Sequence, residues 1–395
     1  MSNKEGVKKV KGAETVGLVP RLRFPEFRGA GEWKARTLDS LLDYLQPTDY
    51  LVSDTRYSDA HKTPVLTAGK TFILGYTNEQ HGIFRENLPV IIFDDFTTAT
   101  QFVDFPFKAK SSAMKILQAK KGANIKFLYE AMQVISYEVG AHERHWISTF
   151  APMPILAPKP NEQQKIADCL SSLDEVITLE SQKLEALKVH KKGLMQQLFP
   201  AEGETVPRLR FPEFRGAGGW EEKKLGSVCE VLNNRRKPVS SGGREKGEYP
   251  YYGASGIVDY VRDYIFDERL LLVGEDGAKW GPFEKTAFIA DGKYWVNNHA
   301  HVLRTIDVSD TLLENYLTMI DIGPYVTGAA PPKLTLGKLK GINVCLPPLM
   351  NEQQKIADCL SFLDEVITLE SQKLDMLKTH KKGLMQQLFP KLEEV

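Results

Sequence analysis

The chain has 395 residues, of which 42% are hydrophobic and 10% aromatic, and its 51 Lys and Arg balance 51 Asp and Glu. This length excludes a single small core and this composition excludes a disordered chain, so two or more globular modules are expected. The neutral charge argues either against nucleic-acid binding or for a subunit whose partners supply the positive charge around the nucleic acid.

The N-terminal segment does not have the pattern of a secretory signal. Residues 1–18 are charged and lack an apolar segment, and no apolar run in the chain approaches the ~20 residues that span a bilayer. The four cysteines form no C-x-x-C pair, so we expect reduced thiols rather than a redox or zinc motif. The sequence predicts a cytoplasmic protein without a membrane partner, with flexible tails at 1–18 and 391–395.

The chain repeats a frame and varies what lies inside it. The segment NEQQKIADCLSSLDEVITLESQKLEALKVHKKGLMQQLFP at 161–200 returns at 351–390 with 36 of its 40 residues identical. A shorter block, VPRLRFPEFRGAG, occurs at 19–31 and again at 206–218. The stretches between these blocks share almost nothing. A repeated frame with diverged inserts presents two different surfaces to one kind of partner.

The first insert predicts a mixed α/β domain over residues 19–160. Its segments TPVLTAGKTFILGYT and LPVIIFDDFTTATQFVDF have the turn-punctuated apolar pattern of strands, and NIKFLYEAMQVIS that of a helix. The insert ends in APMPILAPKP, whose prolines predict a rigid junction with the helix that follows.

Residues 161–200 predict one long helix. Asn161 as N-cap, with Gln164 three residues later, would begin it, and Pro200 would end it. About 37 residues at ~1.5 Å each give a rod of ~55 Å. Its apolar residues recur every three or four positions, as in a heptad seam, and two charged residues interrupt them. The seam consists of Ile166, Leu170, Leu173, Ile177, Glu180, Leu184, Leu187, Lys191, Leu194 and Leu198.

The second half of the chain repeats this plan. We expect a second mixed α/β domain over 201–350, with strands in YPYYGASGIVDYV, ERLLLVGEDGAKWG and KYWVNNHAHVLR. A second helix is expected over 351–390. Its seam consists of Ile356, Leu360, Leu363, Ile367, Leu374, Leu377, Leu384 and Leu388.

An apolar seam needs a partner, and the twin helix supplies one. A parallel pair would oppose Glu180 with Glu370, two like charges in a desolvated seam. An antiparallel pair can place Glu180 beside Lys381 and Lys191 beside Glu370, so we predict an antiparallel coiled coil in that register. The fold class is then α+β, with two mixed α/β domains, two long helices and a pseudo-twofold internal repeat. The alternative, in which each helix packs only on its own module, stays open.

The sequence predicts no catalytic site and no cofactor. No glycine-rich cofactor loop follows a strand, and no Asn-Pro-Pro-aromatic run for base methylation occurs. His142 with His145, and His299 with His301, resemble pairs of metal ligands. Because no third ligand lies near either pair, strand or loop histidines are the better interpretation.

What remains are polar, basic and aromatic clusters at turns and strand ends, which are residue types that read base edges in DNA. Arginine suits guanine and asparagine suits adenine in the major groove, at ~1–3 kcal/mol of discrimination per contact. The alternative for each residue is a solvated loop. The DNA-contact candidates are Thr97, Thr98, Lys110, Ser111, Arg144, Asn233, Asn234, Arg235, Arg236, Lys237, Lys279, Trp280, Asn297, Asn298 and His299.

With its variable inserts and near-identical helices, the chain from about residue 19 to 390 resembles the specificity subunit of type I restriction-modification systems. The most specific stretches are LPPLMNEQQKIADCLSFLDEVITLESQK with its first copy, and GEDGAKWG followed by WVNNHAHVL. The first insert departs from the second because it lacks a GEDGAKWG-like loop.

The resemblance implies two target-recognition domains, each reading one half of a bipartite, asymmetric target in double-stranded DNA, and an antiparallel helical spacer between them. It also implies two methyltransferase subunits that bind S-adenosylmethionine and modify adenine, and two ATP-dependent restriction and translocation subunits. The chain itself would be non-catalytic and free of cofactor.

A spacer of ~55 Å covers at most ~16 base pairs at ~3.4 Å each, and two readers on one face of DNA stand about one turn, ~10 base pairs, apart. We therefore expect a fixed number of unspecified base pairs between the half-sites. Three other interpretations stay open: a standalone nuclease or methyltransferase with a duplicated domain, a coiled-coil scaffold without DNA specificity, and the specificity subunit of a fused, type IIB-like restriction-and-modification enzyme.

Overall fold

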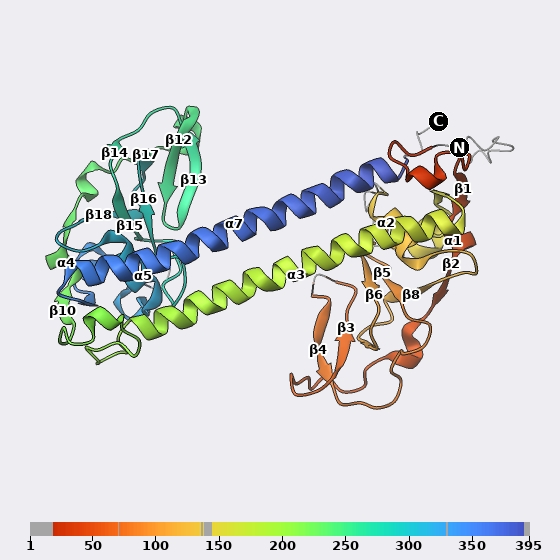
Figure 1. Cartoon of the computed structure of the whole chain (residues 1–395), viewed down its shortest axis with the longest axis horizontal. Helices are drawn as coiled ribbons and strands as arrows, with labels where there is room; N and C mark the ends of the chain where they lie inside the picture. The colour runs from red at the N-terminus through yellow and green to blue at the C-terminus, as the bar shows by residue number, and fades with distance from the viewer. Residues whose placement is uncertain (1–18, 70, 136, 138–143, 329–330, 391–395) are drawn as a thin grey trace, which may run out of the picture. The chain divides into compact units, whose positions relative to one another are not determined.

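The computed structural model describes residues 19–69, 71–135, 137, 144–328 and 331–390. The tails expected at 1–18 and 391–395, and His142, lie outside these residues. The chain forms two compact units (Figure 1): the first contains residues up to Leu179 together with those from Leu374 onward, and the second is Glu180–Lys373. Each unit therefore holds one globular domain and about half of each long helix.

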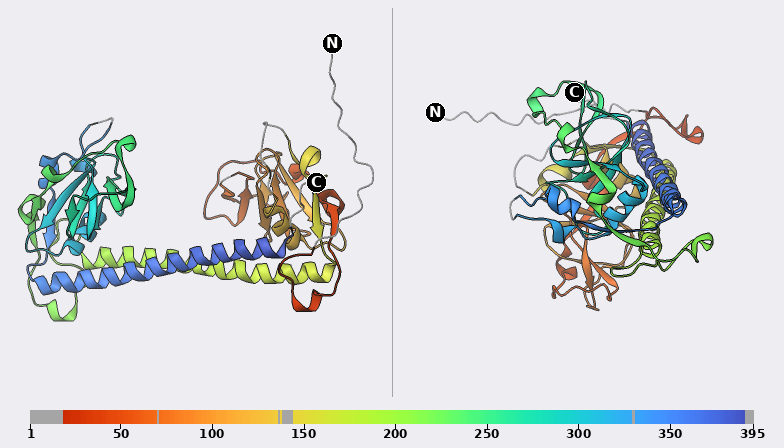
Figure 2. Two further views of the ribbon diagram at one scale, coloured as in Figure 1. Left: turned by 90° about the horizontal axis from the view of Figure 1, so that it is seen from above. Right: turned by 90° about the vertical axis from the view of Figure 1, so that its left-hand side faces the viewer.

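The two long helices are confirmed. Helix α3 spans Pro160–Leu198 and helix α7 spans Met350–Leu388, and both are unbroken ribbons in Figure 2. The expected N-cap at Asn161 is wrong by two residues, because the carbonyl of Lys159 accepts the first helical bond, from Gln163 N at 3.1 Å. Pro160 suits the first helical position, where a backbone N–H would have no partner within the helix.

The first domain, from β1 to β9, is built on two sheets. A four-stranded antiparallel sheet has the order β2-β8-β5-β6, and a three-stranded sheet has the order β4-β3-β7, in which β3 and β7 are parallel. The strands are β1 (Lys34–Thr37), β2 (Leu42–Leu45), β3 (Thr63–Leu66), β4 (Ile73–Thr77), β5 (Val90–Asp94), β6 (Thr100–Val103), β7 (Lys108–Ala109), β8 (Met114–Ala119) and β9 (Pro154–Ala157). The helices and helical turns are α1 (Leu38–Leu41), α2 (Ile125–Gln133), η1 (Pro25–Phe27), η2 (Pro47–Tyr50) and η3 (Trp146–Phe150).

The second domain, from β10 to β19, also has two main sheets, with the orders β11-β18-β15-β16 and β13-β12-β17-β14. The strands are β10 (Glu221–Lys224), β11 (Cys229–Val231), β12 (Lys246–Gly253), β13 (Gly256–Val261), β14 (Phe266–Asp267), β15 (Leu270–Gly274), β16 (Ala287–Ala290), β17 (Lys293–Val296), β18 (Ala300–Thr305) and β19 (Asn343–Leu346). The helices and helical turns are α4 (Leu225–Val228), α5 (Asp310–Met319), α6 (Leu336–Lys340), η4 (Pro212–Phe214), η5 (Asn233–Arg235), η6 (Ser241–Gly243) and η7 (Gly323–Tyr325).

The two domains share one topology although their sequences differ. Strands β11, β18, β15 and β16 take the order of β2, β8, β5 and β6, and the parallel pair β3-β7 recurs as β12-β17. The strands expected in both inserts and the helix α2 are confirmed. The proline-rich segments are more than junctions, because each contains a strand: β9 pairs with β1, and β19 with β10. Because proline is rare inside sheets, the sequence did not predict these edge strands.

The ends of the long helices belong to the domain cores. In the first unit the α3 residues Ile166 and Leu170 and the α7 residue Leu388 share one apolar cluster with Trp33. The ring of Phe389, just after α7, lies 6.3 Å from that of Trp33, edge to face. The second unit has the same arrangement with the roles of the helices reversed. There the end of α3 and the start of α7 share an apolar cluster with Trp220.

The repeated block ties each domain to the helices through a buried ion pair. In the first unit Arg23 Nε donates to Glu162 Oε1 at 2.7 Å, and Leu22 N donates to Gln387 O at 3.0 Å. The block therefore joins the start of α3 to the end of α7. In the second unit the block makes the matching contacts: Arg210 Nε to Glu352 Oε1 at 2.7 Å and Leu209 N to Gln197 O at 2.9 Å. These contacts explain why the block is repeated together with the helix.

Ion pairs across the helices show that α3 and α7 run antiparallel within each unit, as predicted. In the second unit Lys191 Nζ lies 2.6 Å from Asp364 Oδ1. In the first unit the repeat equivalents, Lys381 and Asp174, lie 2.6 Å apart. The seam residues expected in both helices are all buried or half-buried, and Leu184 is only 6% exposed.

The predicted register is wrong. Glu180 pairs with Lys373, eight residues before the expected Lys381, which is just over two helical turns. Its repeat equivalent Glu370 pairs with Lys183.

Candidate nucleic-acid interface

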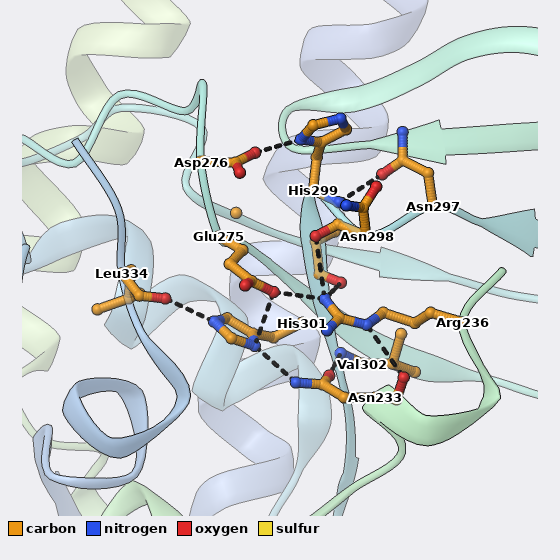
Figure 3. A network of polar contacts seen from close by, with 12 residues as sticks. Asn233, Arg236, Glu275, Asp276, Asn297, Asn298, His299, His301, Val302 and Leu334 are labelled. Carbon is orange, nitrogen blue, oxygen red and sulfur yellow. Dashed lines mark hydrogen bonds and ion pairs between the residues drawn. The ribbon is translucent and has the colours of Figure 1, made fainter. Parts of the chain in front are cut away.

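In the second domain three segments meet at the ends of buried strands, and we call this surface the polar edge of the domain (Figure 3). The segments are the turn after β11 (233–237), the loop after β15 (275–286) and the loop between β17 and β18 (297–299). The backbone joins two of them directly, because Glu275 N donates to His299 O at 2.8 Å.

A buried network forms the floor of this polar edge. Arg236 donates to Glu275 Oε2 at 2.5 Å and to Ala300 O at 2.7 Å. Asn233 accepts from Val302 N at 3.0 Å, and its amide lies 2.8 Å from His301 Nδ1. Because these groups satisfy one another, the network holds the three segments rigidly rather than offering free groups to a ligand.

The charge states of the floor follow from its contacts. Burial raises the pKa of Glu275, but the cations Lys333, 2.8 Å away, and Arg236 outweigh it, and the net pKa lies below the ordinary value. Burial lowers the pKa of His301, so this ring is neutral at pH 7. Its Nε2 lies 2.7 Å from Leu334 O, an acceptor only, so the proton is on Nε2, and Nδ1 accepts from Asn233.

Above this floor lies an exposed rim. Asn234, Lys237, Asn298 and His299 are exposed, and the Lys279 side chain is 80% exposed. The rim presents donors and acceptors on short loops anchored in the sheet. Hydrogen-bonding groups of this kind can contact base edges and phosphates.

Five candidates are buried or paired within the protein rather than free on the rim. Trp280 packs against the main core cluster, and Asn297 is 6% exposed and accepts from His299 N at 2.7 Å. Asn233 and Arg236 are members of the floor. Arg235 is exposed but pairs with Glu268 at 2.6 Å. These contacts favour a supporting role for all five residues.

The first domain has an equivalent floor built from other residues. Asp95 directly follows β5, as Glu275 follows β15, and Lys115 is the second residue of β8, as His301 is of β18. Asp95 and Lys115 form an ion pair at 3.2 Å, and their side chains are 2% and 1% exposed. Asp95 also accepts from Trp146 N at 2.9 Å. A buried carboxylate thus occupies the same place in each domain, beside Lys115 in the first and beside the neutral ring of His301, 3.5 Å away, in the second.

The candidates of the first domain lie on its own polar edge. Thr97 and Thr98 form the turn between β5 and β6, where Thr98 has a φ of 60° and Asp94 Oδ1 accepts from Thr97 N at 3.1 Å. Ser111 is exposed between β7 and β8, whereas Lys110 is half-buried, 5.9 Å from the Tyr57 ring.

Arg144, exposed before η3, completes this set. Its carbonyl accepts from Ser148 Oγ at 3.0 Å, and Asp95 O accepts from the following residue, His145, through the backbone N–H at 2.8 Å. The segment that carries Arg144 is therefore bonded to the floor of the same edge.

The two polar edges differ although their scaffolds agree. Lys110 and Ser111 follow β7 as Asn297 and Asn298 follow β17, so the candidates occupy equivalent positions. The connection after β5 has five residues, whereas that after β15 has twelve. Equivalent scaffolds with different exposed groups are expected of two readers of different sequences.

Sequence reasoning missed four members of the site: Asp95, Lys115, Asp276 and Lys333. A signal existed for Lys115, which is a lone charge in the apolar strand MKILQA, and for Asp95, which follows the apolar run VIIF. No local signal pointed to Lys333, which reaches Glu275 from 58 positions away in the sequence.

Two other kinds of site, a metal centre and a membrane-spanning helix, are absent from the described part of the chain. Among those residues no group of three or more His, Cys, Asp or Glu side chains is placed to hold a metal ion. Nor does any described helix combine the length and the apolarity needed to cross a bilayer.

Known proteins resemble this chain in sequence. The specificity subunit of the Escherichia coli type I restriction enzyme EcoR124I/EcoR124II is 43% identical over 247 residues, which are 59% of this chain and 59% of that protein. The specificity subunit of the type I restriction enzyme MjaIX of Methanocaldococcus jannaschii is 24% identical over 268 residues, 61% of each chain. The chain thus matches less than two thirds of the length of either relative.

A solved structure shows the same fold. The S subunit of the type I restriction-modification system from M. genitalium has a TM-score of 0.66 and 17% sequence identity, and the match covers 95% of this chain and 100% of that one. The family model of the type I restriction modification DNA specificity domain matches residues 30–189 and again 217–379. The chain therefore belongs to the family of type I restriction modification DNA specificity domains and carries that domain twice.

Proposed function

We propose that this chain is the DNA-recognition subunit of a type I restriction-modification complex and that each domain reads one half of a bipartite target. The proposal rests on one contrast: the repeated block and helices, which we call the frame, are nearly the same in both units, whereas the polar edges of the two domains differ. The frame contacts Arg23–Glu162 and Arg210–Glu352 are the same in both units at 2.7 Å, whereas the polar edges carry different side chains. Family membership supports this reading.

The repeated frame suits two copies of one partner. Because 36 of 40 residues of the helix segment recur, a methyltransferase subunit that binds one copy finds nearly the same side chains on the other. We propose two such subunits as partners, and restriction and translocation subunits as further members of the complex. The chain itself is non-catalytic in this proposal, and adenine methylation and DNA cleavage belong to its partners.

The neutral charge of the chain fits this assignment. With 51 basic and 51 acidic residues the chain has no excess charge to hold DNA by itself. Non-specific affinity for DNA comes from phosphate contacts, so the partners would supply most of it while the polar edges supply selectivity. The lengths of α3 and α7, 39 residues each, would fix the number of unspecified base pairs between the half-sites.

The test is the modification pattern in DNA. The full chain is produced together with its methyltransferase subunit in a host that lacks other adenine methylation, and modified adenines are mapped genome-wide. The expected pattern is one asymmetric motif of two short specified parts separated by a constant number of unspecified base pairs. Modification at a short undivided motif, or a pattern unchanged when the chain is omitted, would refute the proposal. Sequence-specific cleavage or methylation by the isolated chain would favour a duplicated-domain enzyme instead.

A further inference from the structure

Among the exposed polar residues labelled in Figure 3, His299 makes the most hydrogen bonds to the rest of the domain. This fixed position makes it the best candidate for a specific contact with a base. Its backbone N donates to Asn297 Oδ1 at 2.7 Å, and its carbonyl accepts from Glu275 N at 2.8 Å. Its ring contacts the Asp276 carboxylate through Nδ1. The ring is nevertheless 52% exposed, so one edge remains free to meet a ligand.

The partner on Nδ1 determines what the free edge can do. Asp276 is 19% exposed, and Lys333 Nζ lies 4.0 Å from its second oxygen. An ionised carboxylate only accepts hydrogen bonds, so Nδ1 must carry the ring proton. In the neutral ring Nε2 is then an acceptor that points away from Asp276.

A hydrogen-bond acceptor at His299 Nε2 favours bases that present a hydrogen-bond donor. In the major groove adenine N6 and cytosine N4 are hydrogen-bond donors, whereas guanine and thymine present acceptors. We propose that His299 Nε2 accepts a hydrogen bond from the exocyclic amine of an adenine or a cytosine in the half-site read by the second domain, and that Asp276 is the positioning residue that sets the tautomer. This inference rests on the proposed function and specifies one contact of it.

The equivalent place in the first domain supports a role in specificity rather than in folding. There Asp95 N donates to Ala113 O at 3.0 Å as Glu275 N donates to His299 O, so Ala113 stands at the place of His299, and the residue after Asp95 is Phe96. The buried pair Asp95–Lys115 matches Glu275–His301, whereas the exposed pair Asp276–His299 has no counterpart of the same residue types. The domain fold therefore does not require the exposed pair, and a difference confined to one reader is expected of a base contact.

The test measures base preference with the complete complex. The full chain and its methyltransferase subunit are assayed on duplexes in which each position of the target is varied in turn. The wild-type complex should prefer adenine or cytosine at one position of one half-site. The His299→Ala variant should lose about 5- to 150-fold discrimination at that position alone, with the other positions and the thermal unfolding midpoint unchanged.

Two further variants separate positioning from structure. Asp276→Ala should lose discrimination at the same position, and Asp276→Ala combined with His299→Ala should lose no more than His299→Ala does. His299→Asn should restore a preference, now narrowed to adenine, because asparagine pairs with adenine through two hydrogen bonds. As a matched control, Lys279→Ala on the same rim should weaken binding to all duplexes equally. A variant that acts only on structure would behave like this control.

Three outcomes would overturn the proposal: an unchanged profile in His299→Ala, a wild-type preference for guanine or thymine at the affected position, or an effect of Asp276→Ala that persists without His299. If the wild-type complex selects a bipartite motif and the His299→Ala variant selects the same motif, only the His299 contact is refuted. A wild-type complex with no bipartite preference would refute the proposed function and this contact together.

Discussion

Arg210 and Glu352 form the same bidentate ion pair in the second unit that Arg23 and Glu162 form in the first. Arg210 Nε and Nη2 donate to the two carboxylate oxygens at 2.7 and 2.8 Å, and the two side chains are 7% and 0% exposed. The indole of Trp220 adds a third donor, 3.3 Å from Oε1. The pair connects the repeated block to the first turn of α7 and is part of the frame that both units share.

This contact predicts a large effect on stability. Glu352→Ala should lower the free energy of unfolding of its unit by about 3–5 kcal/mol, because a buried guanidinium is left without its partner. Glu162→Ala should have a similar effect in the first unit. Replacing Arg210 and Glu352 together by Met and Leu should recover much of the loss. Urea unfolding followed by tryptophan fluorescence measures these changes.

The matched control is the exposed pair beside it. Lys355 lies 3.7 Å from Glu213, and both side chains are about half exposed. Lys355→Ala should leave the unfolding midpoint within error of wild type. If Glu352→Ala were equally harmless, the block would not be anchored as described.

The register of the helices can be measured by double-mutant cycles. Lys191 and Asp364 should show a coupling of about 0.2–1 kcal/mol, as is usual for exposed or half-exposed pairs. Lys191 and Glu370, which the seam pattern alone would oppose, should show none. Thermal unfolding of the four variants of each cycle gives these couplings. Coupling in the second cycle and not in the first would contradict the register.

The buried floor of the second domain predicts a pH dependence. Burial lowers the pKa of His301, so the unfolded state, with an ordinary pKa of about 6.5, binds a proton more readily than the folded state does. The stabilising contribution of neutral His301 is therefore complete above pH 6.5 and falls as the pH drops below that value. Amide exchange in β18, corrected for intrinsic rates, should become faster between pH 6.5 and 5.

The first domain provides the internal comparison for this effect. Lys115 takes the place of His301 in β8, so this strand has no histidine there and its exchange should show no such acceleration. His301→Gln should remove the acceleration in β18. An equal response of both strands would show that His301 is not its source.

The exposed lysines of the second polar edge predict a salt effect. Lys237→Ala and Lys279→Ala should each weaken binding of the complex to all duplexes alike and reduce the slope of log affinity against log salt by about 1. Binding titrations at several salt concentrations measure both quantities. A change in base preference without a change in slope would mean that these lysines contact bases rather than phosphates.

The internal repeat by itself predicts most of the fold. The duplicated 40-residue segment and its apolar period predict both long helices. The antiparallel direction is also confirmed, although keeping Glu180 away from Glu370 is not its cause, because the two side chains still lie within hydrogen-bond reach of each other. The register could not be obtained in this way, because a leucine seam tolerates shifts by whole turns. It is fixed by Ile166, Leu170 and Leu388, which are anchored in a domain core with Trp33, a contact distant in sequence.

The candidate residues show a similar limit. In the second domain the sequence predicted loops that the structure brings together, since residue type and glycine-flanked turns are local properties. It could not separate the floor from the rim, because Asn233 and Asn234 look alike until Asn233 is seen to bond Val302 N while Asn234 remains exposed. Burial of a loop residue depends on partners such as Lys333, which approach from remote parts of the chain.

The central claim is that each domain reads its own half of the target. The most direct measurement replaces residues 34–157, from β1 to β9, by the corresponding insert of a relative with another specificity and maps modified adenines in the host that carries the hybrid and its methyltransferase subunit. One half of the motif should change, while the other half and the number of unspecified base pairs stay the same. A motif that is unchanged, or altered in both halves, from a hybrid that folds and still modifies DNA would contradict the account.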